Sequence, residues 1–161
     1  MGGYDKSKKD AKSSAVGDFP PLTTSTNERL NMVSLDQETL DVCVVDDDVS
    51  VLRSTRRLLD SAGWNVEVFT DPGAFLERAA LRRPDVAIID IRMPKMNGFE
   101  VQACLRRVSP STRVIILTSK DDPSVRSMAM NAGASAFFVK GVDNKEFLAG
   151  IKAAADSETS F

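Results

Sequence analysis

The sequence predicts an α/β protein in which a five-stranded parallel sheet is covered by helices on both faces. From about residue 41 onward, strand patterns and helix patterns alternate five times with short connections. Two of the strand patterns, 42–45 and 86–89, are continuous apolar runs, which fit strands buried on both faces of a parallel sheet. Alternating units of this kind join parallel strands by right-handed crossovers.

The first two strands differ in pattern, and each is followed by an amphipathic helix. The first strand is predicted over 42–46, and the helix after it ends at Gly63, because glycine commonly stops a helix. The second strand, 65–69, alternates polar and apolar residues as an exposed edge strand does. The second helix opens at the cap-like Thr70-Asp71-Pro72. The expected buried faces are Val51, Leu52, Thr55, Leu58, Leu59 and Ala62 in the first helix, and Phe75, Leu76, Ala79 and Ala80 in the second.

The second half of the chain repeats the alternation three times. The remaining strands are predicted at 86–90, 114–118 and 136–139. The fourth helix is predicted to begin at Asp122-Pro123 and to stop at Gly133, and the fifth to begin at Asn144. The expected buried faces of the last three helices are Val101, Leu105 and Val108; Val125, Met128, Ala129 and Ala132; and Phe147, Leu148, Ile151 and Ala154.

Composition restricts the classes of function. The 161 residues carry a net charge of −2 with 42% hydrophobic residues, which suits one globular domain and gives no general attraction to nucleic acid or to a membrane. No apolar run reaches membrane-spanning length, and no signal-peptide pattern is present. Cys43 and Cys104 are expected to be reduced core residues, so the cytoplasm is the expected location. The absence of histidine excludes Ser-His and Cys-His nucleophiles and a phosphohistidine on this chain.

Residues 1–39 differ from the rest of the chain. Lysines are mixed there with glycine, serine, threonine and aspartate, and no apolar period is present. We expect a disordered N-terminal extension or a remnant of recombinant expression, with a docking segment as the alternative. The folded domain is expected over 40–161.

Polar residues follow four of the predicted strands at the points where they end. Asp46 and Asp47 follow the first strand, Asp90 the third, Thr118 the fourth and Lys140 the fifth. In a flavodoxin-like strand order, 2-1-3-4-5, these ends lie together at the topological switch point. Carboxylates gathered there would repel each other and need a divalent cation, most plausibly Mg²⁺.

The charges of these residues suggest a role for each. Asp46 and Asp47 are candidate metal ligands, and Asp90 is the candidate nucleophile. Thr118 offers a hydroxyl donor, and Lys140 offers a cation for a phosphoryl oxygen. Each of these residues taken alone has a structural explanation, and the neighbouring Asp48 is expected to cap a helix.

Several motifs stand at the strand ends and loops: Val45-Asp46-Asp47-Asp48, Ile89-Asp90-Ile91-Arg92-Met93-Pro94 with Asn97-Gly98, Leu117-Thr118-Ser119, and Phe137-Phe138-Val139-Lys140 after Gly133-Ala134. Together they resemble the receiver domain of two-component response regulators. The segment Ser61-Ala62-Gly63-Trp64 resembles in particular receivers attached to helix-turn-helix transcription factors. The similarity covers about residues 41–156 and implies a CheY-like three-layer sandwich. It also implies Mg²⁺-dependent transfer of a phosphoryl group from a sensor histidine kinase onto Asp90. Mg²⁺, or Mn²⁺ in its place, would be bound directly by Asp47, Asp90 and the backbone carbonyl of Arg92, with Asp46 acting through water.

The same resemblance implies a conformational switch. Thr118 would move toward the phosphoryl oxygens, and Phe137 would rotate into the vacated space unless it is an ordinary core aromatic. The remodelled surface would be the fourth helix, fifth strand and fifth helix, which could form a homodimer. We further expect that Arg92 and Lys120 tune dephosphorylation. Gly141 departs from the proline that receivers usually carry there, which makes a cis peptide improbable and suggests altered kinetics or loop order.

Three alternatives to this interpretation remain open. The chain could be a stand-alone receiver acting through protein contacts, although the better expectation is that a transcriptional effector domain is absent here, since no DNA-reading element is visible. An aspartate-nucleophile phosphatase would usually carry a second acid where this chain has Arg92. A flavin or nucleotide carrier would need a phosphate-binding loop where the acids follow the first strand. We expect no catalysis beyond the domain's own phosphorylation and dephosphorylation.

Overall fold

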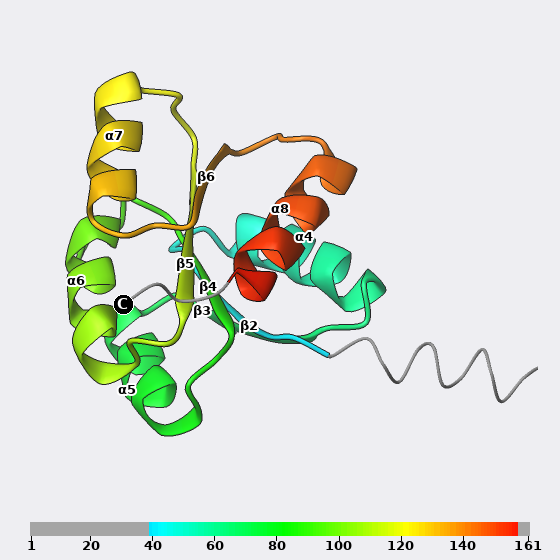
Figure 1. The fold of residues 1–161 in the computed structure, drawn as a ribbon, viewed down its shortest axis with the longest axis horizontal. Coiled ribbons are helices and arrows are strands. Elements are labelled where there is room, and N and C mark those ends of the chain that lie inside the picture. Colours follow the sequence, from blue (N-terminus) through cyan, green and yellow to red (C-terminus); the bar gives the residue numbers. More distant parts are fainter. Residues whose placement is uncertain (1–38, 158–161) are drawn as a thin grey trace, which may run out of the picture. The chain divides into compact units, whose positions relative to one another are not determined.

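The computed structural model describes residues 39–157, which contain five strands and five helices in strict alternation (Figure 1). The strands are β2 (Asp41–Val45), β3 (Asn65–Phe69), β4 (Val86–Ile89), β5 (Arg113–Thr118) and β6 (Ala136–Val139). The helices are α4 (Val49–Ser61), α5 (Pro72–Arg82), α6 (Gly98–Val108), α7 (Pro123–Asn131) and α8 (Asn144–Asp156). The predicted order of elements is confirmed.

The five strands form one parallel sheet in the order β3-β2-β4-β5-β6. This is the predicted order 2-1-3-4-5, and it leaves the alternating strand β3 at an edge. The fully apolar β2 and β4 are neighbours, with Val45 opposite Ile89 at their carboxyl ends. The residues that follow these two strands therefore lie side by side.

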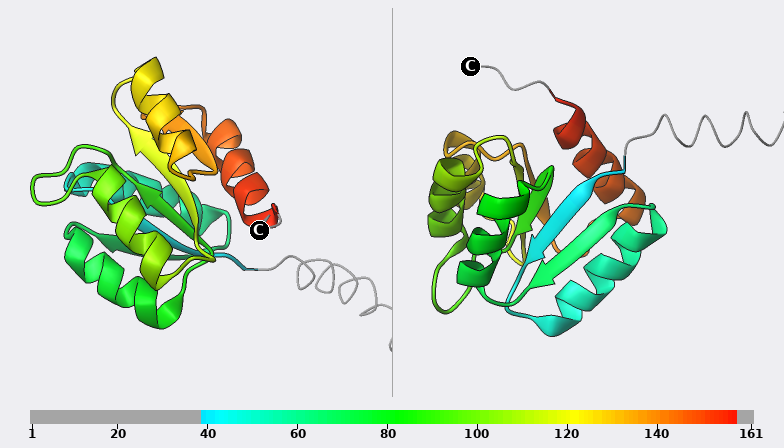
Figure 2. Two further views of the ribbon diagram at one scale, coloured as in Figure 1. Left: turned by 60° about the vertical axis from the view of Figure 1, so that its left-hand side comes forward. Right: turned by 90° about the horizontal axis from the view of Figure 1, so that it is seen from below.

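Helices cover both faces of the sheet, with α4 and α8 on one face and α5, α6 and α7 on the other (Figures 1 and 2). Side chains that alternate along each strand divide the core accordingly. Val45 and Ile89 pack with Phe75 and Leu105 on the face of α5, α6 and α7. The opposite cluster includes Val42, Val44 and Ile88 from the sheet, and Leu52, Leu59, Phe147 and Ile151 from α4 and α8. The sandwich thus has two cores separated by the sheet.

Each helix begins with a side-chain cap just beyond a strand end. Aspartate or asparagine accepts hydrogen bonds from free backbone N–H groups of the first turn, which stabilises the helix start. The caps are Asp48, Asp71, Asn97, Asp122 and Asp143. The predictions that Asp48 caps a helix and that Asp71-Pro72 opens one are confirmed. Gly63 and Gly133 take φ values of +84° and +106° directly after the caps of α4 and α7, as expected of helix stops.

Several predicted boundaries and buried positions are wrong. β2 and β4 end at Val45 and Ile89, one residue before the predicted ends, although the backbone N–H groups of Asp46 and Asp90 still donate to neighbouring strands. Ala62 and Ala80 are exposed, and Met128 and Val108 keep 54% and 37% of their surface in contact with solvent. In α7 only Ala129 is buried, and Val125 is half-buried against the core beneath that helix.

Three other predictions concern the N-terminal extension, membrane-spanning segments and the two cysteines. The predicted N-terminal extension lies almost entirely outside the described residues. Among the helices that the structure describes, none is both long and apolar enough to cross a membrane. Cys43 is buried, Cys104 is half-buried, and both are free thiols.

Candidate functional site

Three carboxylates meet at the carboxyl edge of the sheet. Asp46 and Asp47 follow β2, and Asp90 follows β4. The backbone N–H of Asp90 donates to the carbonyl of Val45 at 3.0 Å, which ties the end of β4 to β2. One carboxylate oxygen from each of the three aspartates lies within 4.8 Å of the other two. The sheet topology therefore gathers acids that are more than 40 positions apart in the sequence.

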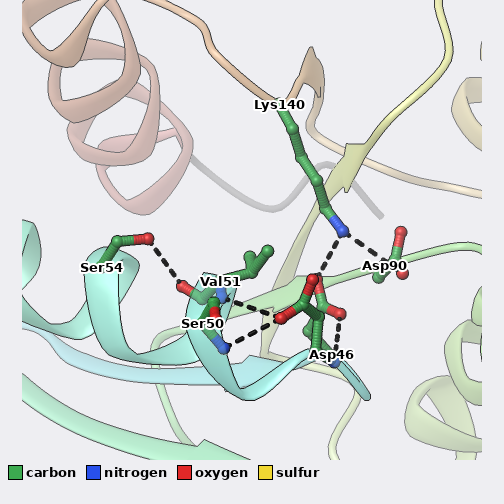
Figure 3. A network of polar contacts seen from close by, with 7 residues as sticks. Asp46, Ser50, Val51, Ser54, Asp90 and Lys140 are labelled. Atoms are coloured by element: carbon green, nitrogen blue, oxygen red, sulfur yellow. Dashed lines mark hydrogen bonds and ion pairs between the residues drawn. The ribbon is translucent and has the colours of Figure 1, made fainter.

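Lys140 supplies the positive charge at this cluster (Figure 3). Its Nζ lies 2.8 Å from Oδ2 of Asp46 and 3.5 Å from Oδ2 of Asp90. Lys140 follows β6, which is separated from β4 by β5, so its long side chain extends across one strand to reach the acids. Its backbone N–H donates to the carbonyl of Thr118 at 2.7 Å, which fixes the start of the side chain.

The three aspartates differ in exposure and in their partners. Asp46 and Asp90 are 2% and 5% exposed, whereas Asp47 is exposed. Oδ1 of Asp46 accepts a hydrogen bond from the backbone N–H of Asp48 at 2.9 Å. The carboxylate of Asp48 in turn caps α4 through the N–H groups of Ser50 and Val51. Asp48 therefore has a structural role and holds the turn that carries Asp46.

Burial and crowding alter the protonation equilibria of the site. The pKa of Asp90 is raised from 3.8 to about 6, first by burial and then by the neighbouring charge of Asp46, with Lys140 offsetting part of both effects. Burial by itself would lower the pKa of Lys140, but its contacts with Asp46 and Asp90 outweigh that effect and the pKa is raised. Lys140 is therefore an ammonium ion facing a surplus of carboxylate charge.

The donor set fits a hard divalent cation. Mg²⁺ prefers a few carboxylate oxygens together with water, and the oxygens of Asp46, Asp47 and Asp90 are close enough to share one ion. Three carboxylates face the single ammonium group of Lys140, so a cation bound here would neutralise the remaining negative charge. The side chain of Arg92 is exposed, and the role predicted for its backbone carbonyl stays a prediction.

Two further predicted residues line the sheet beside the acids. Thr118 is the last residue of β5 and is 4% exposed. Phe137, on β6, is 6% exposed and packs in the core under α7. The guanidinium carbon of Arg126 lies 4.6 Å from the centroid of the Phe137 ring, a cation–π contact that sequence reasoning missed, since no pattern in the chain links the two residues.

Arg92 and Lys120 are not joined to the acids. Both side chains are exposed, and no ion pair within residues 39–157 links either of them to the aspartates. Gly141 follows Lys140 with φ at +96°, and no cis peptide occurs in this part of the chain. Proline cannot adopt a positive φ, so the departure at position 141 changes the path of the loop as well as the residue type.

Comparisons with known proteins give a consistent result. The family model of the response regulator receiver domain matches residues 42–152. Response regulator MprA from Mycobacterium leprae (strain TN) is 37% identical over 112 residues, covering 70% of this chain and 49% of the relative. The chain thus spans about half the length of the curated relatives it matches.

Solved structures are similar over most of the described residues. A response regulator receiver domain protein (CheY-like) from Methanospirillum hungatei JF-1 has a TM-score of 0.69 at 28% identity, covering 74% of this chain and 95% of that one. A two-component response regulator of the LuxR family from Aurantimonas sp. SI85-9A1 also has a TM-score of 0.69, at 27% identity, covering 73% of this chain and 86% of that one.

Proposed function

This chain belongs to the family of response regulator receiver domains, and on that premise we propose that Asp90 accepts a phosphoryl group from a sensor histidine kinase. The observation that carries the proposal is the cluster of Asp46, Asp47 and Asp90, with Lys140 paired to Asp46 and Asp90. Such a site combines a nucleophilic carboxylate, oxygen ligands for a divalent cation and a fixed ammonium group. These are the components that phosphoryl transfer requires.

In the proposed reaction an oxygen of Asp90 forms a bond to phosphorus as the bond between phosphorus and the histidine nitrogen of the donor breaks. Asp90 must be ionised to attack, so its raised pKa has to be lowered in the loaded site. Mg²⁺, bound by Asp47, Asp90 and the carbonyl of Arg92 with Asp46 acting through water, would neutralise charge on the carboxylates and the phosphoryl oxygens. Mn²⁺ could replace it.

Lys140 would orient the phosphoryl group. Its contact with Asp90 is 0.7 Å longer than its contact with Asp46, at 3.5 Å against 2.8 Å, so the ammonium group is held mainly by Asp46. Lys140 can therefore approach a phosphoryl oxygen on Asp90 without first breaking a short ion pair to that residue. The Thr118 hydroxyl, at the end of the strand between β4 and β6, would donate to another phosphoryl oxygen.

We propose that phosphorylation changes the surface formed by α7, β6 and α8. Movement of Thr118 would make room for the ring of Phe137, which is buried in this structure under the guanidinium group of Arg126. The changed surface could pair with a second copy of the chain. Arg92 and Lys120, both exposed on loops that follow β4 and β5, would tune the attack of water on phosphorylated Asp90.

The output of the full protein is proposed from its relatives. Their names describe response regulators, and the chain spans about half their length, which agrees with an effector domain outside the present sequence, such as a transcription factor. A stand-alone receiver is the alternative. Residues 40–161 would be the receiver, preceded by a separate N-terminal extension. A cytoplasmic location would give the domain access to its kinase and keep both thiols reduced. We propose no contact of this domain with nucleic acid or membrane.

Intact-mass spectrometry tests the proposal directly. Incubation with acetyl phosphate and Mg²⁺ is expected to add one phosphoryl group to the wild type and none to Asp90→Asn. Asp143→Asn is the matched control, because Asp143 also follows a strand and asparagine can still cap α8. Size-exclusion chromatography of the same samples reports any dimer. Modification of Asp90→Asn, or turnover of a phosphate ester without stable modification, would contradict the proposal, and the second result would favour a phosphatase.

A further inference from the structure

Gly98 is the first residue of α6, and its backbone lies against the residue that carries the candidate phosphoacceptor. A Cβ atom at position 98 would lie 2.5 Å from the carbonyl oxygen of Asp90, 3.1 Å from its carbonyl carbon and 2.9 Å from Cα of Ile91. All three are backbone atoms, so no side-chain rotation can relieve the overlap. The peptide between Asp90 and Ile91 can keep its place only if residue 98 has no side chain.

Hydrogen bonds close the loop at this point. The backbone N–H of Gly98 donates to the carbonyl of Ile91 at 2.8 Å, across the neck of the loop between β4 and α6. Beside it, Asn97 and Glu100 form a reciprocal capping box with both bonds at 2.9 Å. The start of α6 is thus a fixed support: it binds the Ile91 carbonyl directly and lies against the peptide between Asp90 and Ile91.

Space, and not an unusual backbone conformation, restricts this position. Gly98 is not among the glycines with positive φ, and an L-residue could adopt its backbone angles. Gly141 shows the opposite case, since its φ is +96° and no atom lies within 4 Å of a Cβ placed there. A methyl group at position 98 would therefore displace backbone, whereas one at position 141 would meet conformational strain only.

We propose that Gly98 is a positioning residue: its missing side chain lets the start of α6 hold the Asp90–Ile91 peptide where the Asp90 carboxylate and the Arg92 carbonyl can share one Mg²⁺. The inference rests on the proposed function. A Cβ atom needs at least 3.0 Å, and ordinarily 3.4 Å, from such an oxygen, so an alanine at position 98 would push the Asp90 carbonyl oxygen back from 2.5 Å by roughly 0.5–1 Å. Misplacement on this scale costs about 10²-fold in the rate of a reaction that depends on alignment.

The test compares Mg²⁺ affinity and phosphorylation rate in Gly98→Ala with two controls. Gly73→Ala adds the same methyl group near the start of α5, where the nearest atom would be 3.5 Å away. Ile151→Val removes a methyl group from the core on the opposite face, so it controls for a general loss of stability. Isothermal titration calorimetry gives the Mg²⁺ dissociation constant, and urea unfolding in EDTA gives the folded fraction.

Gly98→Ala is expected to raise the Mg²⁺ dissociation constant at least about tenfold and to slow phosphorylation by acetyl phosphate at saturating Mg²⁺ about 10²-fold. Both controls should stay within about twofold of the wild type. Wild-type affinity and rate in a folded Gly98→Ala protein would overturn the inference. If Gly98→Ala does not fold, the double variant Asn97→Ala/Glu100→Ala decides, because it removes the capping box that fixes the start of α6 beside Gly98. An unchanged Mg²⁺ dissociation constant in this double variant overturns the inference, and a rise of several fold supports it.

The same data separate this inference from the proposed function. A wild type that binds Mg²⁺ but takes no phosphoryl group would end the proposed function, while loss of Mg²⁺ binding in Gly98→Ala would still support positioning by Gly98. A wild type that is phosphorylated on Asp90 alongside an equally active Gly98→Ala would leave the function intact and refute the positioning role.

Discussion

Replacing Asp90 by asparagine is expected to stabilise the metal-free protein near neutral pH and to have little effect in acid. Asp90 is 5% exposed, and folding raises its pKa from 3.8 to about 6, first through burial and then through the charge of Asp46. The folded state therefore binds this proton more tightly than the unfolded state. The contribution of Asp90 to the free energy of unfolding is highest below pH 3.8, and it falls as the pH rises from 3.8 to about 6. Asparagine has no charge to bury and avoids this loss.

The size of the effect follows from the change in proton affinity. A pKa change of one corresponds to about 1.4 kcal/mol, so the rise to about 6 represents a loss of about 3 kcal/mol for the wild type above that pH. Solvent at the mouth of the site screens part of this cost, so we expect about 2 kcal/mol in favour of Asp90→Asn at about pH 7.5. At about pH 4 the difference should shrink to about 0.5 kcal/mol, because the carboxyl is then protonated in the folded protein and only about half ionised in the unfolded chain.

Urea unfolding in EDTA at both pH values measures the difference. Glu77→Gln, which neutralises an exposed acid on α5, is the matched control and should change stability little at either pH. Added Mg²⁺ should stabilise the wild type more than Asp90→Asn and so narrow the gap, because only the wild type retains all three acids. Equal unfolding free energies for wild type and Asp90→Asn at about pH 7.5 would refute the reasoning about burial and charge.

Three other outcomes follow from the packing. Gly150→Ala should destabilise the protein by about 1–3 kcal/mol, although alanine normally favours a helix. The reason is that its Cβ would lie 2.3 Å from Cζ of Phe138, whose ring packs edge-on against Phe147. Urea unfolding measures the change, and an equal loss of stability from Gly150→Ala in a Phe138→Leu background would contradict this cause. Gly141→Asn should lower the Tm less than Gly141→Val does, since asparagine tolerates a positive φ and a β-branched residue does not. Burial, and then the charge of Glu67, raise the pKa of the Cys43 thiol to about 12. A thiol reagent at about pH 8 should therefore modify Cys104 in the native protein and Cys43 only after unfolding, and equal modification rates at both thiols would contradict this prediction.

Much of the fold was predictable because its main signals are local. The continuous apolar runs that became β2 and β4, the alternation of β3, and the caps at Asp48 and Asp71 each depend on a few neighbouring residues. The predicted burial of Met128 failed for a different reason. Periodicity identifies the apolar face of a helix, but tertiary packing decides how much of that face is covered, and in α7 only Ala129 is buried.

The acids of the site could be listed from the sequence, because strand ends in a parallel sheet collect at one edge. The differences among these residues in contacts, exposure and pKa could not be predicted from the sequence. The preference of Lys140 for Asp46, the solvent exposure of Asp47 and the raised pKa of Asp90 depend on distances between three strands. The stacking of Arg126 on Phe137 has the same origin, since it joins a helix to a strand across a packed interface.

The sequence by itself determined which elements form, in which order, and which charged residues stand where strands end, because hydrogen bonding and hydrophobic periodicity act over a few residues. Tertiary structure decided how close those charges come and how little room surrounds them. At Gly98 the sequence contains only a glycine after an asparagine, whereas the fold presses that glycine against the backbone of Asp90. Such contacts arise when separate elements pack at the density of a solid, and no local pattern encodes them.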